Sequence, residues 1–481
     1  MGSRIGSIRE GREELNTASE TMTHIESFIR EQMRSGQTPG LSVGILADGE
    51  TVLSRGYGFA DVATRAPMTE RSGVVIGSTT KALTCVAILQ LAEDGLLRLD
   101  DPVIRYLPSF RLRDQAHAAA ITIRQAITHT AGLPPTLSTQ TEFLFSDDAA
   151  DDALARYIET LADRVPFGPP GGQWAYANDG FTLAGRIIEV VSGRSYEEYM
   201  GERVFAVLGF EDACFAYKRQ GEVATAHDFG PDGAPYPSFF PHSRAASAAG
   251  SELILSVRDA LRWLAAVLDD GRAAGGSLLR QESFAETIRP HFRVQPEGRI
   301  AGGAESHYAL GWQVARLAGV PMISHGGSTI TMGSKFLVLP DQRIAVAVLS
   351  NSSSDVNEIV AEGIARILLG GEPSRSFPSI DPSFEPNRSR WPAIAGTYEP
   401  QVVQNAVPAS LPIELDGVQL VAHTYPADHR RRAGDIFLRP VGDLDFVLSG
   451  RGRTGGRATF AIHDGGVDAI WMEVPLKKRG V

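Results

Sequence analysis

Two side chains that could do chemistry together, Ser78 and Lys81, lie three positions apart in the stretch Gly77–Lys81. If this stretch is helical, positions i and i+3 share a face, so the serine hydroxyl and the lysine amine can meet. A serine hydroxyl stays protonated at neutral pH, and a neighbouring lysine can take that proton if burial lowers its pKa. Because a chain of this length contains about one S-x-x-K by chance, the pair needs support from other residues.

The helix expected to carry the pair runs from Ser78 to Asp94, with Gly95 as its C-cap. Its residues are apolar on nearly all sides, which is typical of a helix buried in the middle of a domain. A lysine at the mouth of such a helix would lose much of its hydration. The sequence therefore favours a lowered pKa for Lys81.

Tyr176 and Asn178 form the only Tyr-x-Asn of the chain, and they follow a Pro-Gly turn that can present both side chains to a cleft. Beside a lysine ammonium the tyrosine would more readily ionise or relay a proton. The asparagine amide both donates and accepts hydrogen bonds, so it suits holding Lys81 and a substrate amide. An aromatic turn followed by a helix-capping asparagine would explain the same residues without any function.

A His-x-Gly triplet, His325–Gly327, ends a strand expected over residues 322–327. Glycines at such a place let the backbone of a substrate approach closely. A second His-x-Gly begins at His463, but it is interpreted as a hairpin turn in the C-terminal part of the chain. Context therefore favours His325.

Ser42 is a rival nucleophile, because residues 40–44 match G-x-S-x-G. The nucleophile elbow with that motif needs a strand before the serine and a helix after it. Here a Pro-Gly break precedes Ser42 and strand-like residues follow. We interpret the match as chance and Ser42 as a strand residue.

The order of expected elements predicts a sheet with helices packed on it, together with a separate helical subdomain. Strands are expected at residues 41–46, 50–58, 308–314, 322–327, 335–340 and 343–350, and further helices at 21–35, 121–129, 149–161, 181–192, 256–269 and 356–369. The predicted domains are a catalytic domain (1–370), a Pro-rich linker (371–391) and a small all-β domain, sandwich or barrel (392–481). Residues 138–148 and 219–247 are expected to form loops around the cleft.

The amino-acid composition limits the kinds of partner that the protein is expected to bind. The 481 residues are 43% hydrophobic and 21% charged, as in an ordinary globular protein of two or three domains. The net charge of -11 and the lack of long basic runs argue against nucleic acid. No apolar run approaches the ~18–20 residues of a membrane span, and the N-terminal residues lack a signal-peptide core, so a cytoplasmic location without membrane contact is expected. Cys85 and Cys214 are the only cysteines, and a disulfide is not expected.

The three motifs, in this order, resemble the active-site elements S-x-x-K, Y-x-N and [K/H]-x-G of the penicillin-recognising serine hydrolases. The nearer branch holds class C β-lactamases, DD-peptidases, D-aminopeptidases and esterases. Residues 121–134, the Pro-Gly run before Tyr176 and the stretch 308–312 add to a resemblance that spans about 40–369. It implies an α+β fold, with an antiparallel sheet, helices on both faces and a helical subdomain. The C-terminal domain resembles a lipocalin-like barrel, which would shape the cleft, mediate assembly or act as a lid.

The resemblance also implies a mechanism. Ser78 would attack a carbonyl and form an acyl-enzyme, with Lys81 and Tyr176 sharing the general-base and general-acid roles. The backbone N–H groups of Ser78 and Ser328 would hold the oxyanion. Residues expected to bind substrate or the oxyanion are Asn178, His325, Gly326, Gly327 and Ser328. No metal and no cofactor is implied.

The third element departs from the β-lactamase pattern, because His325 stands where those enzymes usually carry a lysine that holds the substrate carboxylate. The resemblance therefore implies weak β-lactamase activity at most, and a small ester, amide or peptide as substrate, with a carboxylesterase preferred. Two alternatives stay open: an acyltransferase or peptide cyclase that uses the same acyl-enzyme, and a non-enzymatic binding or sensing protein of the same fold. Assembly into a homo-oligomer is also left open.

Overall fold

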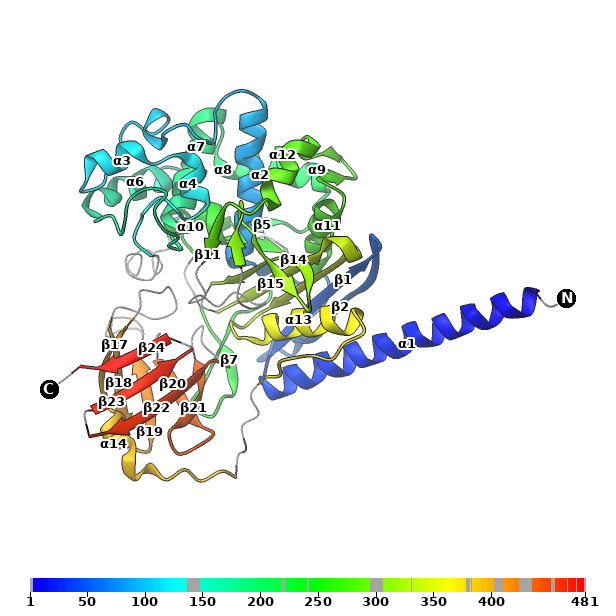
Figure 1. Cartoon of the computed structure of the whole chain (residues 1–481), viewed down its shortest axis with the longest axis vertical. Helices are drawn as coiled ribbons and strands as arrows, with labels where there is room; N and C mark the ends of the chain where they lie inside the picture. The colour runs from blue at the N-terminus through cyan, green and yellow to red at the C-terminus, as the bar shows by residue number, and fades with distance from the viewer. Residues whose placement is uncertain are drawn as a thin grey trace.

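The structure is a computed structural model of the chain. It describes residues 3–135, 148–218, 221–239, 242–294, 306–329, 331–377, 381, 383–401, 410–423, 435–450, 455–464, 466–472 and 474–479, with the side chains of α1 described from residue 19 onward. Figure 1 shows a helical part, a large sheet below it and a separate barrel that contains the C-terminal strands.

A nine-stranded antiparallel sheet forms the centre of the first part of the chain. In spatial order its strands are β11 (Phe292–Val294), β12 (Ser306–Tyr308), β13 (Gln313–Leu317), β14 (Val320–Ser328), β15 (Gly333–Leu339), β16 (Ile344–Ser350), β1 (Gly40–Ala47), β2 (Glu50–Asp61) and β3 (Ala66–Pro67). The N-terminal hairpin thus pairs with β16 from the far end of the catalytic region. This pairing confirms the expected antiparallel sheet with strands from both ends of the region.

Both faces of this sheet are buried, and successive side chains of each strand point to opposite faces. On β15, Leu337 and Leu339 face the core formed with α1 (Ser3–Ser35) and α13 (Val356–Leu368). Phe336 and Val338 alternate with them and join the larger core that contains α2 (Thr80–Glu93) and α11 (Val257–Leu268). Helices therefore cover both faces, and the predicted fold class is confirmed.

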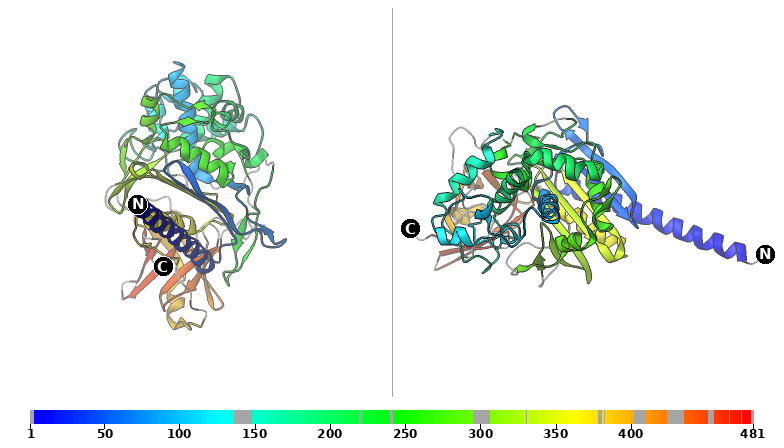
Figure 2. Two further views of the ribbon diagram at one scale, coloured as in Figure 1. Left: turned by 90° about the vertical axis from the view of Figure 1, so that its right-hand side faces the viewer. Right: turned by 90° about the horizontal axis from the view of Figure 1, so that it is seen from above.

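The helical subdomain surrounds α2, whose residues are buried from Thr80 to Leu91. In Figures 1 and 2 the helices of this subdomain cluster on one side of the sheet. Its other helices are α3 (Gln115–Ala120), α4 (Ile123–Ile127), α6 (Ala153–Thr160), α7 (Asp179–Ser192), α8 (Tyr196–Met200), α9 (Ala206–Leu208), α10 (Arg244–Ser251) and α12 (Gln281–Ile288). Short strands complete this part of the chain: β4 (Val74–Val75), β5 (Cys214–Phe215), β6 (His227–Phe229), β7 (Pro235–Pro237), β8 (Leu253–Leu255), β9 (Arg272–Ala273) and β10 (Gly276–Ser277).

The single strand expected over residues 308–314 is wrong. The chain instead forms β12 and β13 as a hairpin, with a turn in which Ala309 N–H donates to Trp312 O at 2.7 Å. Gly311 in this turn has φ +75°, and a Cβ placed on it would lie 2.6 Å from Ala82 Cα. The hairpin contacts the backbone of α2 at this turn, so the turn needs a residue without a Cβ there. Strand periodicity in the sequence cannot reveal such a contact.

The C-terminal strands close into an eight-stranded barrel, which settles the choice between sandwich and barrel. The strands are β17 (Gly396–Pro400), β18 (Leu411–Asp416), β19 (Gln419–His423), β20 (Asp435–Pro440), β21 (Asp445–Gly450), β22 (Arg457–His463), β23 (Gly466–Trp471) and β24 (Val474–Lys478). Helix α14 (Trp391–Ile394) precedes them, and Trp391 and Ile394 belong to the barrel core. Pairing of β17 with β24 removes the exposed edges.

Among the described residues, hydrogen bonds from three barrel side chains join the barrel to the catalytic region, one of them from Gln419 Nε2 to Pro231 O at 3.5 Å. The β6–β7 hairpin reaches the barrel, where Ser449 Oγ donates to Gly230 O at 3.4 Å. Arg439 of β20 donates to Gln37 Oε1 at 3.0 Å. Figure 1 shows β7 directed toward the barrel strands. Among the helices of the described ranges, none combines the length and apolar character needed to cross a bilayer.

Candidate active site

Ser78 lies in a short 3-10 helix, η1 (Gly77–Thr79), that leads directly into α2. The expected helix over 78–94 is confirmed apart from this tighter first turn. Gly77 has φ +59°, a left-handed conformation that a residue with a Cβ rarely adopts. Ser78 stays partly exposed at the start of a buried helix.

Lys81 lies one turn further along, with a fully buried side chain (0% exposed). Its Nζ donates to Ser78 Oγ at 3.0 Å and to the backbone carbonyl of Gly250 at 2.9 Å. Burial lowers the pKa of Lys81 to about 7 because the charged amine loses its hydration. The sequence-based expectation of an S-x-x-K contact and a lowered pKa agrees with this geometry.

Tyr176 is a second neighbour of Ser78. Its hydroxyl hydrogen-bonds the Ser78 side chain, and Lys81 Nζ lies 5.1 Å from the centre of its ring. Burial of the phenol raises the pKa of Tyr176, so the group stays protonated at neutral pH. This direction is opposite to the expected easier ionisation, since loss of hydration outweighs the hydrogen bond from Ser78. Asn178 is the N-cap residue of α7, but its side chain makes no capping hydrogen bond.

The third element, at the end of β14, lies against the turn that carries Ser78. A Cβ on Gly327 would lie 1.8 Å from Ile76 O, and a Cβ on Gly77 would lie 2.5 Å from the backbone nitrogen of Ser328. The two glycines therefore permit the close approach of β14 and η1. Ser328 Oγ shares a hydrogen bond with Ser353 Oγ at 2.7 Å.

His325 is 3% exposed, and both of its ring nitrogens have partners within the protein. Nε2 bonds the Tyr308 hydroxyl at 3.0 Å, and Nδ1 bonds Gly326 O at 2.6 Å. Burial and the nearby Lys81 lower the pKa of His325 to about 3. The expected neutral histidine is thus in place, while its ring is committed to neighbouring protein groups.

Three further residues of the site were not identified from the sequence. His129 stacks on Tyr176 with ring centres 4.1 Å apart, and Tyr308 bonds to both His129 and His325. Both residues lie in the stretches 121–134 and 308–312 that carry the resemblance. A histidine and an aromatic residue in those stretches could therefore have been named as site candidates from the sequence. Gly250 gave no signal, because it acts through its backbone carbonyl.

A cluster of buried ion pairs anchors α10, the helix whose last turn contains Gly250. Arg244, at the start of α10, is 0% exposed and pairs with Glu189 of α7 and Glu197 of α8. Two carboxylates from different helices thus anchor α10 beside Lys81. Of the segments expected to line the cleft, 219–247 includes the β6–β7 hairpin and the start of α10, whereas 138–147 lies outside the described residues.

The rival residues lie elsewhere. Ser42 is a fully buried residue of β1, with strand on both sides, and therefore lacks the setting of a nucleophile elbow. His463 ends β22 and pairs with Gly466 in a hairpin, as expected. Neither Cys85 nor Cys214 takes part in a disulfide. Within the described residues, no cluster of histidine, cysteine, aspartate and glutamate has the arrangement of a metal site.

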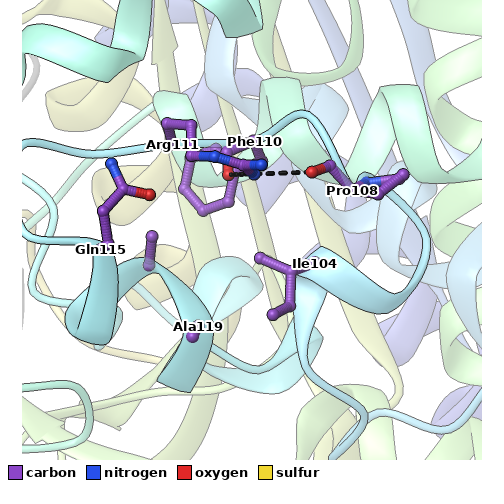
Figure 3. Close-up of a pocket in the computed structure, with 7 residues that line it drawn as sticks. Ile104, Pro108, Phe110, Arg111, Gln115 and Ala119 are labelled. Carbon is purple, nitrogen blue, oxygen red and sulfur yellow. Dashed lines mark hydrogen bonds between the residues drawn. The ribbon is translucent and has the colours of Figure 1, made fainter.

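A cavity of about 350 Å³ in the helical subdomain shares no residue with this site. Figure 3 shows Arg111 among its lining residues, and the guanidinium is directed at Pro108. Arg111 donates to the carbonyls of Pro108 and Phe110 at 2.6 and 2.8 Å. The Arg111 guanidinium thus closes a turn through these two carbonyls.

The family model described as Beta-lactamase matches residues 25–369. The chain belongs to the beta-lactamase family. The match contains the whole sheet and all three motifs, and it ends where α13 ends. This beta-lactamase-family protein thus has the fold of serine hydrolases that include penicillin-binding proteins, amidases and esterases.

Individual relatives agree with this assignment. Penicillin-binding protein 4 of Amycolatopsis lactamdurans is 29% identical over 75% of this chain and 93% of its own length. The octameric penicillin-binding protein homologue from Pyrococcus abyssi has a TM-score of 0.64 at 25% identity, over 95% of this chain and 99% of that one. This likeness therefore includes the barrel. EstCE1, described as a hydrolase with promiscuous acyltransferase activity, has a TM-score of 0.59 at 21% identity, over 69% of this chain and 94% of that one.

Proposed function

We propose that the protein is a serine hydrolase that forms an acyl-enzyme on Ser78 and acts on small carboxylic esters. The observation that carries the proposal is the contact of 3.0 Å between Lys81 Nζ and Ser78 Oγ, made by a lysine whose burial lowers its pKa to about 7. A general base with a pKa near the working pH is the most effective one.

In the first step Lys81, as the neutral amine, takes the proton of Ser78 while Oγ forms a bond to the substrate carbonyl carbon. Gly250 O accepts a hydrogen bond from Nζ and keeps the amine oriented in both charge states. The carbonyl oxygen becomes an oxyanion between the backbone N–H groups of Ser78 and Ser328, which lie close because of Gly77 and Gly327. Such fixed donors are typically worth several kcal/mol.

Collapse of this intermediate breaks the bond to the leaving group. The proton held by Lys81 reaches the leaving alkoxide or amine through the hydroxyl of Tyr176, which is protonated at neutral pH and hydrogen-bonded to Ser78. Water then attacks the acyl carbon, with the same two residues acting in reverse. Asn178, on the Tyr176 loop, is proposed to orient the acyl group.

The substrate class follows from charge at the third element. His325 is neutral, and its ring nitrogens bond to Tyr308 and Gly326. The adjacent cation, Lys335 of β15, is buried near Glu358 at 3.8 Å. A substrate carboxylate would find no charged partner in these residues, which favours neutral esters over β-lactams and other carboxylate-bearing amides.

Intact-mass spectrometry tests the nucleophile. The wild-type protein is incubated with a fluorophosphonate, a p-nitrophenyl ester or a β-lactam, in parallel with Ser78→Ala and Ser42→Ala. We expect one covalent adduct that Ser78→Ala abolishes and Ser42→Ala retains, with ester turnover exceeding β-lactam turnover at least 100-fold. A folded wild-type protein that forms no adduct would point to a binding or sensing protein instead.

Acyl transfer is the second candidate, because EstCE1, which shares the fold, is described with that activity. In that case the same acyl-enzyme would pass its acyl group to an amine or alcohol instead of water. If the accepting amine belongs to the acyl group itself, the enzyme would be a peptide cyclase. Product analysis with a primary alcohol added to the ester assay separates the two outcomes.

Assembly into a homo-oligomer is proposed by analogy with the octameric relative, and the mass in solution, measured by light scattering, tests it.

A further inference from the structure

Three buried side chains behind Tyr176 form an unbroken hydrogen-bond chain. His129 Nε2 lies 3.2 Å from the Tyr308 hydroxyl, and that hydroxyl lies 3.0 Å from His325 Nε2. The three side chains are 2%, 0% and 3% exposed. They come from the loop after α4, the end of β12 and the middle of β14, so only the tertiary structure brings them together.

A backbone group fixes the direction of this chain at the His325 end. The N–H of Ala177 donates to His129 Nδ1 at 3.1 Å, and a backbone N–H cannot accept. The carbonyl of Ala177 lies 3.2 Å from the same nitrogen, so the backbone at this end can pair with either tautomer of His129. At the other end His325 Nδ1 lies 2.6 Å from the carbonyl of Gly326, which can only accept, so His325 carries its proton on Nδ1.

When both histidines are neutral, the Gly326 contact leaves one arrangement for the protons along the chain, since Tyr308 has a single proton to donate. His129 Nε2–H donates to the Tyr308 oxygen, Tyr308 O–H donates to His325 Nε2, and His325 Nδ1–H donates to Gly326 O. Every group in this arrangement is neutral. A second proton on either histidine would put a proton on His129 Nδ1, where it would face the Ala177 N–H at 3.1 Å and exchange that bond for one to the Ala177 carbonyl at 3.2 Å. Burial also lowers the pKa of both histidines, and Lys81 adds to this shift by charge repulsion.

We propose that His129 and Tyr308 are positioning residues of the reaction, and that this neutral, one-directional chain holds both Tyr176 and the third element in place. His129 supports the Tyr176 ring at 4.1 Å between ring centres. The far end of the chain binds Gly326 O, next to Gly327, where β14 meets the turn of Ser78. His325 acts as the last link of the chain and does not bind substrate through its ring.

The effect on catalysis rests on the proposed function, but the proton arrangement does not. Nitrogen-15 NMR of the imidazoles in the wild-type protein measures it directly. We expect His129 as the Nε2–H form and His325 as the Nδ1–H form, with neither becoming charged between pH 5.5 and 8. A charged His325, or either histidine in the opposite tautomer, overturns the proposal whatever the activity.

Tyr308→Phe tests the positioning role, because it removes one hydroxyl and keeps the ring. We expect kcat for a p-nitrophenyl ester to fall at least tenfold, with KM within twofold of the wild-type value. The matched control is Tyr398→Phe in the barrel core, whose buried hydroxyl donates only to a backbone carbonyl, Ile394 O at 2.7 Å. It should lower thermal stability to a similar degree and leave kcat unchanged.

Wild-type kcat in Tyr308→Phe would overturn the positioning role. If Tyr308→Phe does not fold, the tautomer measurement on the wild type still decides the proposal. Failure of the proposed function has a different signature, namely a wild-type protein that no fluorophosphonate labels on Ser78. In that case the tautomers can still be as expected, and the chain would serve a binding site instead of a reaction.

Discussion

At the scale of single residues, Lys81 is placed where a positive charge is costly. It is surrounded by the apolar residues of α2, and the rings of Tyr176 and Phe181 each lie 5.1 Å from its Nζ. These rings give a cation some stabilisation, but desolvation dominates and lowers the pKa to about 7. The same burial that costs stability thus favours the neutral amine, the form that the proposed mechanism needs as a base.

The pH dependence of acylation follows from this pKa. Only the neutral amine can take the proton of Ser78, so the single-turnover rate of acylation should rise with pH and level off above about 7. Lys81→Met should lower the rate by about 10²–10⁴. Stopped-flow measurement with a p-nitrophenyl ester from pH 5 to 9 checks both. A rate independent of pH across this range would assign the base to another group.

The free energy of unfolding should also rise with pH. Between pH 7 and about 10.4 the unfolded chain holds a proton on Lys81 that the folded protein has released. Raising the pH therefore favours the folded state, by up to about 1.4 kcal/mol per pH unit from this group. Urea unfolding should show a steeper rise with pH in the wild type than in Lys81→Met. Equal slopes would mean that Lys81 keeps its ordinary pKa when folded.

At the scale of elements, the site depends on how closely β14 meets the turn before α2. The side chains of this junction are small because backbone contacts backbone there, with Gly327 against Ile76 O and Gly77 against Ser328 N. Ser334 of β15 adds a hydrogen bond to Ile76 O at 2.5 Å. Two proposed oxyanion donors, Ser78 N–H and Ser328 N–H, are brought together by this approach.

Gly327→Ala should separate the two elements, since its Cβ would lie 1.8 Å from Ile76 O. We expect acylation by a fluorophosphonate to slow at least 100-fold and the free energy of unfolding to fall by about 1–3 kcal/mol. Gly326→Ala is the matched control for stability, because the nearest atom to its Cβ is 3.9 Å away. It should stay within about 0.5 kcal/mol of the wild type. Equal stability of the two variants would contradict the proposed close approach.

At the scale of the whole molecule, the barrel has a core of its own. Trp391 is 1% exposed, donates its indole N–H to Asp443 O at 3.0 Å and packs edge-on against Phe446. The clusters around the large sheet contain none of the barrel residues. The division into 1–370, 371–391 and 392–481 remains a prediction that this separation of cores favours.

Trp391→Ala tests that division. Removing a buried tryptophan should lower the stability of the barrel by about 3–5 kcal/mol. Labelling of Ser78 should stay within twofold of the wild type, because the site draws on the other cores. Calorimetry should show one transition that moves and one that does not, and Ile470→Ala, at an exposed position of β23, should move neither. Loss of labelling together with the barrel would show a single cooperative unit.

Local patterns predicted much of this protein. The spacing of Ser78 and Lys81 predicted their contact, since an i,i+3 pair depends only on the helix that contains it. The apolar surroundings of that helix predicted the lowered pKa of Lys81. Strand periodicity predicted the hairpin β1–β2 and the pair β15–β16, and the resemblance of three short motifs predicted the family.

Contacts between distant segments were decided by the tertiary structure alone. Gly250 O reaches Lys81 from 169 positions along the chain, through a backbone atom that no residue type announces. The ring of His325 is directed at Tyr308 and Gly326 because of how β14 packs, although its place in the motif suggested substrate binding. Tyr176 keeps its proton because its neighbours exclude water. Sequence determines what each segment can form by itself, whereas burial and partners, which set protonation and orientation, exist only after the segments have packed.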